Sequence, residues 1–409
     1  MYGRGQGLAY VLRCLEKNTE IIAYIDNFSR IAVSSDGKDI IKEDDIQGDY
    51  DYIVITLMQY HRVKESLIDK GISIDRIICF FDENDVENVL YGNVFDMYKW
   101  KIELLWRYNR EYVEPFLNNS YFEINADKLL ASNDIPQIMD VESTIDEVIQ
   151  RKKSLVRFGD GEFEAIRKQP RMRFQNINNS LSQRLKEILQ SDNGNMVLSI
   201  ADNYGDLSSY TDEAAAAIRR YLTPNVRRDH IRLLDLKRVY GNAYLTRPYY
   251  MYRDKNHEKI RGKFEHLKRI WDSENVLIIE GRHTRFGVGN DLLDCTESIV
   301  RLLVPDKNAF DVYDEILANA EAYSKNRLTL CIIGPTATVL SYDLTKKGNR
   351  AIDIGQVDTE YEWFLRGAPD RCDVPYKTVS EYVNKDVFED LKGDMEDKYK
   401  KEIVGIIGN

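Results

Sequence analysis

Apolar residues over the first 90 positions fall in short runs that alternate with segments of helical spacing. The runs Ile21–Ile25, Tyr52–Ile55 and Ile74–Phe81 predict buried strands, and the segments between them carry apolar residues at helical intervals. Strands that alternate with helices are typical of a parallel sheet, because each connection must cross a face of the sheet. Residues 1–90 are therefore predicted to form a small Rossmann-like domain.

The same alternation returns near residue 140 and continues to residue 374. We therefore predict an α/β protein with two Rossmann-like parallel-sheet domains, the second at residues 140–374, joined by a helical connector at residues 91–139. Residues 375–409 are polar and charged, which predicts a surface helix and tail. Strands of the second domain are expected around Leu155–Val156 and at Met196–Ile200, Asn275–Glu280, Ser298–Val304, Leu328–Gly334 and Ala351–Ile354.

The connector carries a stripe of apolar and aromatic side chains at helical spacing. Such a stripe predicts a helix that packs against a core or another domain, rather than a cofactor site. The residues of the stripe are Trp100, Leu104, Leu105, Tyr108 and Tyr112.

The composition, with 43% hydrophobic and 31% charged residues, is that of a soluble globular protein. The formal charge of -11 argues against a general nucleic-acid binder. Five scattered cysteines without C-x-x-C spacing fit a reducing cytoplasm and give no pattern for structural zinc. The sequence has no signal-peptide pattern and no run of about 20 apolar residues. We therefore expect a cytoplasmic protein, at most peripheral to the inner face of the plasma membrane.

The stretch Arg157–Glu162 has the chemistry of a site for metal and phosphate. A predicted strand ends here, and one glycine separates Asp160 from Glu162. On extended backbone, residues i and i+2 point to the same side, so the two carboxylates would meet. Two carboxylates beside an Arg suit a hard divalent cation, Mn²⁺ or Mg²⁺, that carries phosphate oxygens. The alternative interpretation is a solvated junction between a strand and a turn.

Three further loops follow predicted strands of the second domain, and ligands bind at the carboxyl ends of parallel strands. The loop Glu280–Asp291 contains two Arg and three Gly, so charge and bare backbone N–H groups could both reach phosphate oxygens. Gly334–Thr338 leads into a helix start that can bind an anion, although Thr336 could simply cap the helix. The loop predicted at Asp353–Trp363 offers acids for a metal or a general base, and aromatic rings for a sugar.

The turn Gly3–Gly7, with Asp26 about 20 residues further on, imitates a dinucleotide-binding fingerprint. The imitation is imperfect because Leu8 stands where the third small residue belongs, and the strand before the turn is almost missing. One alternative function is therefore a nucleotide-sugar oxidoreductase or epimerase that uses this domain. Another alternative is a nucleotide-sugar-binding subunit without turnover.

A group of basic residues lies close together in a chain that is acidic as a whole. This patch could dock near anionic lipid, where a lipid-linked acceptor would be found. The alternative is a set of solvated helix faces and loops. The residues are Arg219, Arg220, Arg227, Arg228, Arg232, Lys237 and Arg238.

Four segments, taken in order, resemble the GT-D glycosyltransferases, a family first grouped as a domain of unknown function in bacterial glycan and adhesin-glycosylation clusters. The resemblance covers residues 140–370 and leaves the N-terminal domain outside. One departure is Gln356, at a position associated with a His in the family. The segments are Arg157–Glu162, Thr284–Asp291, Gly334–Leu340, and Asp353–Gly355 with Glu360–Phe364.

The resemblance implies a metal-dependent glycosyltransferase with a Rossmann-like fold that is distinct from the common glycosyltransferase folds. It implies a nucleotide-sugar donor, often UDP-glucose, and a divalent metal tied to Asp160 and Glu162. The expected setting is the biosynthesis of bacterial surface polysaccharide or glycoprotein. The partners would be the donor and a glycan, glycoprotein or lipid-linked acceptor, with no nucleic acid.

Hexosyl transfer breaks the sugar C1–O bond and leaves charge on the nucleotide diphosphate. A metal would act as a Lewis acid on that leaving group, and Arg side chains would add charge-assisted hydrogen bonds. Asp358 or Glu360 is expected to deprotonate the acceptor hydroxyl. Contacts to the nucleotide sugar are expected from Arg157, Gly159, Arg285, Gly287, Asn290, Thr336 and Thr338, and contacts to the sugar or acceptor from Arg247, Tyr249, Tyr361 and Trp363.

Overall fold

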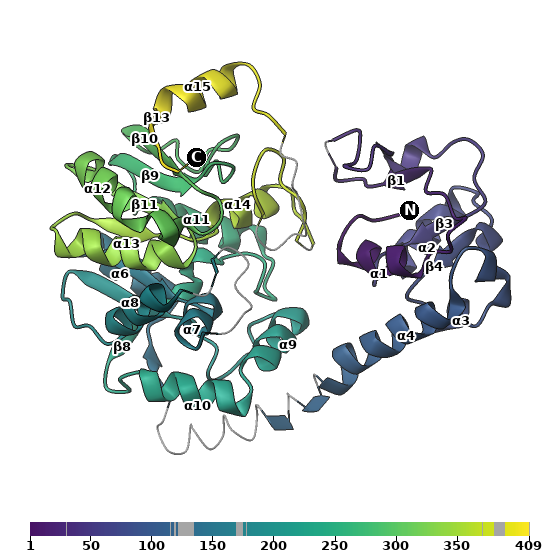
Figure 1. Ribbon diagram of the computed structural model, residues 1–409, viewed down its shortest axis with the longest axis horizontal. Coiled ribbons are helices and arrows are strands. Elements are labelled where there is room, and N and C mark those ends of the chain that lie inside the picture. The colour runs from purple at the N-terminus through teal and green to yellow at the C-terminus, as the bar shows by residue number, and fades with distance from the viewer. Residues whose placement is uncertain are drawn as a thin grey trace. The chain divides into compact units, whose positions relative to one another are not determined.

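In the computed structural model, the described chain forms two compact units (Figure 1). Unit 1 comprises Met1–Phe116 and Arg371–Pro375, and unit 2 comprises the remaining described residues. Among the described helices, none combines the length and the apolar character that crossing a membrane would require. The described residues are 1–29, 31–114, 116–117, 120–121, 135–168, 175–176, 178–369, 371–379 and 389–408.

Unit 1 is built around a small parallel sheet, as the alternating pattern predicts. β1 pairs with β2 and β3 pairs with β4, while Tyr2 bridges both Ile25 of β1 and Ile55 of β3. The strand that the sequence almost lacks is therefore reduced to Tyr2, which joins the two pairs. The elements are β1 (Ala23–Ile25), β2 (Asp39–Ile41), β3 (Ile53–Ile55), β4 (Ile77–Cys79), α1 (Gln6–Cys14), α2 (His61–Asp69), α3 (Glu83–Val86) and α4 (Met97–Tyr108).

The glycine-rich turn of unit 1 lies between Tyr2 and helix α1. Gly3 has a φ of +96°, a conformation that favours glycine, and Gly5 has open space where a Cβ would stand. A Cβ at Gly7 would lie 1.8 Å from the carbonyl oxygen of Thr56, so α1 can approach β3 only because residue 7 has no side chain. The close-packing role that the fingerprint gives to a third small residue therefore belongs to Gly7, and not to the position of Leu8.

Unit 2 is organised on a nine-stranded sheet in the order β13-β10-β9-β11-β12-β6-β7-β8-β5, and every pairing is parallel. The central strands are mostly apolar and mostly buried, because helices cover both faces of the sheet. The predicted α/β class is therefore confirmed. The strands are β5 (Gln137–Ile138), β6 (Ser154–Phe158), β7 (Met196–Ile200), β8 (Val239–Asn242), β9 (Asn275–Gly281), β10 (Ser298–Val304), β11 (Leu328–Ile332), β12 (Ala351–Asp353) and β13 (Ile403–Ile406).

Alternate residues of one strand show how the two faces are covered. Leu198 and Ile200 of β7 belong to the apolar cluster that includes α8, whereas Val197 lies beside Gly241 and Thr144 of α6 on the other face. The helices are α6 (Val141–Gln150), α7 (Asp160–Ile166), α8 (Asn179–Leu189), α9 (Asp212–Tyr221), α10 (Pro224–Leu233), α11 (His257–Lys268), α12 (Tyr313–Ser324), α13 (Pro335–Lys346), α14 (Val357–Leu365) and α15 (Asp394–Glu402).

The neighbouring strands β6 and β12 mark a switch point of the sheet. β6 leads into α7, which packs with α8 on the first face. β12 leads into α14, whose Tyr361 ring lies 4.8 Å from that of Phe264 on α11, and α11 packs with α6 on the second face. The chain therefore leaves these two strands in opposite directions. In open parallel sheets, ligands bind at such a point, beyond the carboxyl ends of the strands.

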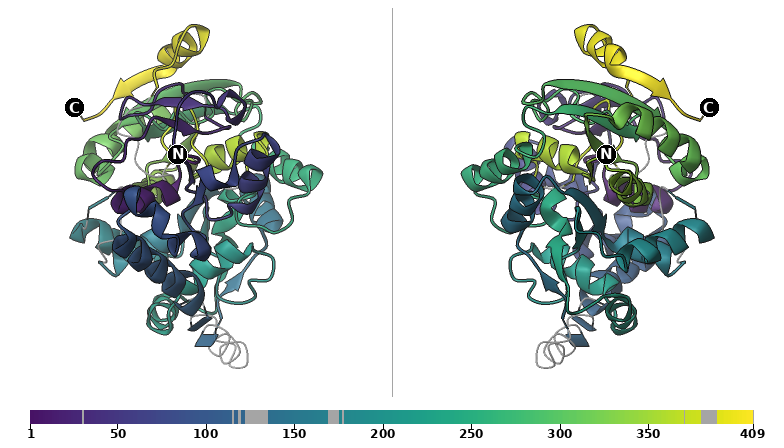
Figure 2. Two further views of the ribbon diagram at one scale, coloured as in Figure 1. Left: turned by 90° about the vertical axis from the view of Figure 1, so that its right-hand side faces the viewer. Right: turned by 90° about the vertical axis from the view of Figure 1, so that its left-hand side faces the viewer.

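The C-terminal segment, yellow in Figure 2, runs along one edge of unit 2, where β13 pairs with β10. The sequence predicts a charged helix and tail here, and the structure adds an edge strand. Arg301 of β10 is 2% exposed and anchors the segment. Its guanidinium donates to Glu280 Oε1 (2.6 Å), to Glu402 Oε2 (2.6 Å) and to the carbonyl oxygen of Phe286 (3.0 Å). One buried cation thus ties β9, β10 and α15 together.

We expect Arg301→Met to destabilise the protein by about 3–5 kcal/mol, because it leaves the buried Glu280 and the half-buried Glu402 without their cation. The measurement is the free energy of unfolding in urea. The matched control is Lys400→Met. Lys400 lies at the end of α15, close to Glu402 in the sequence, and pairs with Glu396 in solvent. We expect no measurable change in the control, since exposed pairs contribute little. Equal effects of the two substitutions would contradict this role of Arg301.

Candidate functional site

The centre of the candidate site is an ion pair between neighbouring strands. Arg157 of β6 donates from Nη2 to Asp353 Oδ1 (2.7 Å) and from Nε to the Asp353 carbonyl oxygen (2.9 Å). Its Nη1 donates to Thr246 Oγ1 (3.0 Å) on the segment after β8. Asp353 is buried, with 2% of its surface exposed. The sequence predicts Arg157 as a nucleotide-sugar contact. In the structure, Arg157 connects the ends of β6 and β12 with the segment after β8.

Two further residues fix the geometry of this pair. Thr338 Oγ1 donates to Asp353 Oδ2 (3.2 Å) and to the carbonyl oxygen of Arg157 (3.0 Å). Gly355 has a φ of +53°, and a Cβ there would lie 2.3 Å from Arg157 Nη2. The guanidinium can therefore lie against the backbone after β12 only because residue 355 is glycine.

The two carboxylates of the D-x-E stretch lie in the first turn of helix α7, and not on extended backbone. The expectation that they share one side is therefore wrong, because residues two apart on a helix point in different directions. Asp160 is exposed, whereas Glu162 is half-buried and accepts the backbone N–H of Gly159 at 2.8 Å. Both acids suit the partial positive charge of a helix N-terminus.

The carboxyl groups at the site have raised pKa values. Burial, and next the charge of Asp353, raise the pKa of Glu162 to about 7, although Arg157 opposes the shift. Burial also raises the pKa of Asp353, again against the effect of Arg157. The site therefore holds more negative charge than one Arg compensates. A cation bound beside Glu162 would favour its ionised form.

Metal binding at this place would have to rely on few protein ligands. Within the ranges that the structure describes, no group of three or more His, Cys, Asp or Glu side chains is placed to hold a metal ion. Mg²⁺-like ions are commonly held by one or two carboxylates together with substrate phosphates and water. Asp160 and Glu162 supply hard oxygen ligands of this kind, so their chemistry fits such an ion. Because the two side chains point in different directions, Glu162 would have to leave the N–H of Gly159 to share an ion with Asp160.

The residues at and after the ends of β7 and β8 also belong to the site, and of these the sequence analysis named only Arg247 and Tyr249. Asn242 Nδ2 donates to Asp202 Oδ2 (3.3 Å), and Asn203 Nδ2 donates to the hydroxyl of Tyr244 (3.2 Å). Burial, and next the charge of Asp160, raise the pKa of Tyr244. The available signal was the same as for the other loops: polar residues directly after an apolar strand.

The predicted phosphate loop between β9 and β10 is bonded to the C-terminal part of unit 2 through Arg285. Arg285 is 9% exposed, and its Nη1 donates to the carbonyl oxygens of Tyr376 (2.8 Å) and Glu389 (2.7 Å). Gly287 has a φ of +71°, and a Cβ there would lie 2.4 Å from Leu293 Cδ1. These two residues therefore shape the loop and anchor the chain that leads to α15.

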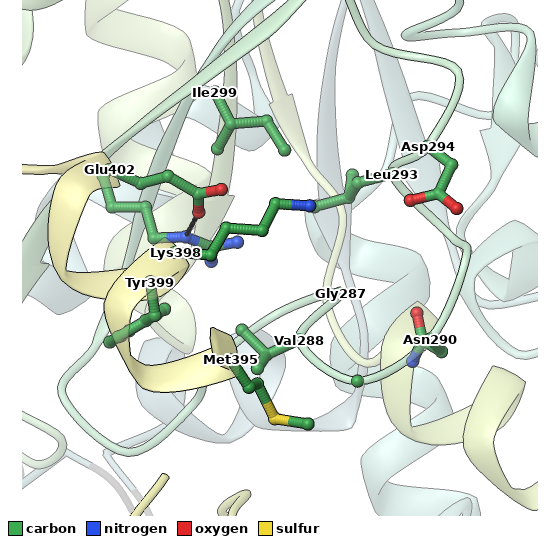
Figure 3. A pocket seen from close by; sticks show the side chains of 12 residues that line it. Gly287, Val288, Asn290, Leu293, Asp294, Ile299, Met395, Lys398, Tyr399 and Glu402 are labelled. Carbon is green, nitrogen blue, oxygen red and sulfur yellow. Dashed lines mark hydrogen bonds and ion pairs between the residues drawn. The ribbon is translucent and has the colours of Figure 1, made fainter. Parts of the chain in front are cut away.

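A recess of about 80 Å³ lies between this loop and α15 (Figure 3). Gly287, Asn290 and Asp294 line it from the loop, and Lys398 and Glu402 line it from α15. The recess is small and charged, and it lies next to the buried pair of Glu402 with Arg301.

The acids predicted as general bases lie on helix α14, where the sequence analysis expects a loop. Asp358 is 4% exposed, and its Oδ1 accepts from Asn290 Nδ2 (2.7 Å) while Lys377 Nζ binds both of its oxygens. Glu360 is fully buried, and its Oε2 accepts the backbone N–H groups of Tyr249 (3.0 Å) and Tyr250 (2.8 Å). Either acid would have to give up these partners before it could act as a base.

The four predicted sugar or acceptor contacts gather around α14. Arg247 Nη1 lies 3.7 Å from Glu360 Oε1. Tyr249 is buried and donates its hydroxyl to the carbonyl oxygen of Ala368 (2.7 Å). Tyr361 and Trp363 are 5% and 1% exposed, so their rings pack in the core. The Tyr361 ring packs against Phe264 of α11 and the Trp363 ring against Tyr250, so neither ring is open to a sugar.

Thr336 and the basic patch complete the predicted residues. Thr336 is fully buried in the first turn of α13, and its hydroxyl makes no hydrogen bond within the described structure. The basic residues from 219 to 238 do not form one exposed face: Arg227 is 3% exposed and donates to the carbonyl oxygen of Tyr204 (2.8 Å), whereas Arg228 and Arg232 are exposed. Docking to lipid through all seven residues is therefore not possible without rearrangement.

Comparisons with known proteins agree on the region that contains this site. Residues 155–382 match the model of a family described as glycosyltransferase GT-D fold, and residues 1–78 match the N-terminal domain described as C2185-like. Glycosyltransferase GlyD of Streptococcus pneumoniae is 34% identical over 74% of this chain, and the probable glycosyl transferase Gly of Streptococcus gordonii is 34% identical over 60%. The matches span 36% and 35% of those two proteins, about a third of their length.

Solved structures show the same similarity. One, of a highly conserved domain of unknown function with a distinct glycosyltransferase fold, is 34% identical, with a TM-score of 0.63 over 68% of this chain and 98% of that one. Another, of a new glycosyltransferase from Streptococcus sanguinis, is 31% identical, with a TM-score of 0.63 over 67% of this chain and 100% of that one.

We expect Gly355→Ala to destabilise the protein more than Gly367→Ala does. Both glycines have similar positive φ values, +53° and +57°, so both alanines carry a backbone strain of about 1–2 kcal/mol. Only the Cβ at residue 355 meets Arg157, because Gly367 has open space around it. Losing the contact between Arg157 and Asp353 should add about 2 kcal/mol or more. Equal losses in chemical denaturation would show that the close approach does not matter.

We expect the stability of the metal-free protein to depend on the ionisation of Glu162. Its folded-state pKa of about 7 lies above the ordinary value of 4.5, so the folded state binds the proton more tightly. This contribution is complete below pH 4.5 and is lost as the pH rises through 7. It amounts to at most about 3 kcal/mol, and to less where solvent reaches the half-buried carboxyl.

The check is the free energy of unfolding at pH 5 and pH 8 in EDTA, for the wild type and for Glu162→Gln. The neutral amide cannot ionise, so the variant should lose less stability than the wild type over this interval. The same pH dependence in both proteins would mean that Glu162 titrates at its ordinary pKa.

Proposed function

The chain belongs to the GT-D fold glycosyltransferases, and from this premise we propose that unit 2 transfers a hexose from a UDP-sugar to a glycan acceptor. The acceptor belongs to the biosynthesis of a bacterial surface polysaccharide or glycoprotein. The curated relatives are about three times as long as the matched region. Their names say only that they are glycosyltransferases, so donor and acceptor are part of the proposal.

The observation that carries the proposal is the Arg157–Asp353 pair at the switch point of the sheet. It lies within the residues that match the family, and it fixes the carboxyl ends of β6 and β12 side by side. The first turn of α7, with Asp160 and Glu162, follows directly on β6. A nucleotide diphosphate placed at this point would lie beside the first turn of α7, where a cation held by its acids could carry the phosphate oxygens.

A divalent cation, Mn²⁺ or Mg²⁺, fits the donor set of Asp160 and Glu162. When bound, it would supply a Lewis acid for the charge that develops on the diphosphate leaving group. Asp160 is exposed and therefore accessible to an ion that also carries phosphate oxygens and water. Besides any contact to the metal, Glu162 keeps the first turn of α7 in place, because its carboxylate accepts the N–H of Gly159.

Thr336 supports a second contact to the donor. Its hydroxyl is buried without a hydrogen-bond partner in the first turn of α13, directly after β11. Buried hydroxyls are rarely left without a partner, because the cost is about 1–3 kcal/mol. A phosphate or sugar hydroxyl would satisfy it once the first turn of α13 opens to the ligand, since Thr336 itself has no exposed surface.

The experiment is a donor screen with the purified chain, a panel of nucleotide sugars, and manganese or EDTA, with free nucleotide as the readout. We expect UDP-sugar hydrolysis that requires metal and that falls by roughly 100-fold or more in Asp160→Ala. The matched control is Asp212→Ala, because Asp212 is the first residue of α9 as Asp160 is of α7. The control should retain full turnover.

Other outcomes separate the alternatives. Binding of NAD without turnover of any nucleotide sugar would favour an oxidoreductase or epimerase that uses the Gly3–Gly7 turn of unit 1. Tight binding of UDP without turnover, with every acceptor tried, would favour a nucleotide-sugar-binding subunit.

A further inference from the structure

A buried histidine packs against helix α7, and the function proposed above does not use it. His230 of α10 is 1% exposed, and its ring stacks on the ring of Phe163 of α7 with centroids 3.8 Å apart. Burial, and next the charge of Arg167, lower the pKa of His230 to about 3, so the ring is neutral near neutral pH. A neutral imidazole has one N–H donor and one bare nitrogen that accepts.

Both ring nitrogens of His230 bond to tyrosine hydroxyls. Nδ1 lies 2.8 Å from the hydroxyl of Tyr204, and Nε2 lies 3.1 Å from the hydroxyl of Tyr221 on α9. The Tyr221 hydroxyl in turn donates to the carbonyl oxygen of Asp160 (3.3 Å) in the first turn of α7. We call the three residues Tyr204, His230 and Tyr221 the hydroxyl–imidazole relay. It joins α7, α9 and α10 (Figure 1) and ends at the residue that carries the exposed carboxylate of the site.

The direction of the hydrogen bonds in the relay follows from its last bond. A carbonyl oxygen can only accept, so Tyr221 gives its single hydrogen to Asp160. The Tyr221 oxygen then accepts the N–H of His230 Nε2, and the bare Nδ1 accepts the hydroxyl hydrogen of Tyr204. With the proton on Nδ1 instead, Nε2 would need the Tyr221 hydrogen, and the bond to Asp160 would be lost. The geometry therefore selects the Nε2–H tautomer.

Asp160 needs support from outside its own turn. It stands between Gly159 and Gly161, which give the backbone on either side extra conformational freedom. Glu162 ties this turn through the N–H of Gly159, but it would leave that bond to share an ion with Asp160. The Tyr221 bond engages the carbonyl oxygen of Asp160 and not its carboxylate, so it can hold the turn while both acids turn to the ion.

We propose that His230 and Tyr221 are positioning residues of the metal site, because the hydroxyl–imidazole relay fixes the backbone of Asp160 and with it the direction of the carboxylate. The inference rests on the proposed function, in which Asp160 holds a divalent cation. Both residues act through Asp160. Partners that orient a metal ligand in this way commonly contribute roughly 10–100-fold to metal affinity.

The first test is the binding of Mn²⁺ in the presence of UDP, measured as the loss of the electron paramagnetic resonance signal of free Mn²⁺. Tyr221→Phe keeps the ring and removes the hydroxyl, so we expect the affinity for Mn²⁺ to fall by roughly 10-fold or more. The matched control is Tyr323→Phe. Tyr323 of α12 is also half-buried, and its hydroxyl also donates to a backbone carbonyl oxygen, that of Val404 (3.0 Å) beside β13. The control should bind Mn²⁺ as the wild type does.

The second test separates the hydrogen bond of His230 from its packing. Glutamine and methionine have similar shapes, and both lose the stacking on Phe163, but only glutamine can donate an N–H to Tyr221. We expect His230→Gln to bind Mn²⁺ several-fold more tightly than His230→Met. Equal binding by the two variants would mean that His230 only fills space, and would overturn its positioning role.

The third test uses the unaltered protein without metal and does not depend on turnover. Nitrogen-15 NMR of the histidine-labelled chain distinguishes a protonated ring nitrogen from a bare one. The His230 signals, among those of five histidines, are identified by their absence in His230→Gln. We expect a protonated Nε2 and a bare Nδ1. A proton on Nδ1 would contradict the relay, because Tyr221 would then donate to His230 and not to Asp160.

The outcomes separate this inference from the proposed function. If the wild type binds Mn²⁺ with UDP and Tyr221→Phe binds it equally well, the positioning role is overturned and the proposed function stands. If the wild type binds no Mn²⁺ with UDP, the metal-dependent function and the positioning role are overturned together.

Discussion

The ion pair between Arg157 and Asp353 is the interaction on which the candidate site depends. It is nearly buried, it spans two neighbouring strands, and it has a third partner in Thr246 beyond β8. A buried charge that loses its partner is costly, so the strand ends cannot separate without a large loss of stability. The same requirement explains Gly355, because any side chain there would occupy the space of the guanidinium. The site is therefore built on a rigid sheet, and its variable parts are the helices and loops that leave the sheet.

Charge balance links this pair to the chemistry that we propose. Asp353 and Glu162 share the positive charge of one Arg, and burial keeps the pKa of Glu162 near neutrality. A cation with its phosphate ligands would relieve the excess of negative charge at the point where the exposed Asp160 can hold it. Burial also raises the pKa values of Asp358 and Glu280, but each of these acids has a cation in direct contact, Lys377 and Arg301, whereas the described residues place none against Glu162. This difference sets the end of β6 apart from the other acidic clusters of the unit.

The sequence was sufficient for the central strands of the sheet, because strands such as Leu328–Ile332 and Asn275–Gly281 are largely buried and read as mostly apolar runs, but it did not predict the edge strands β5 and β13. It failed at the strand ends. The glycines around Asp160 suggested a turn, yet acids in a first helical turn are stabilised by the helix dipole, and α7 begins there. The acids and rings of Val357–Leu365 looked available for catalysis. Their burial depends on Lys377, Asn290 and the backbone of Tyr249, which are distant in sequence. Side chains that meet only in the folded chain cannot be assigned from spacing alone.

The central claim is that a nucleotide diphosphate and its metal bind beyond β6 and β12 of unit 2. The most direct measurement is a crystal structure of the chain with UDP and manganese, with the anomalous signal of manganese used to place the metal. The account expects the metal beside Asp160 and Glu162, and the diphosphate between the first turn of α7 and the backbone after β12. Nucleotide bound instead at the Gly3–Gly7 turn of unit 1, with no manganese signal at Asp160, would contradict it.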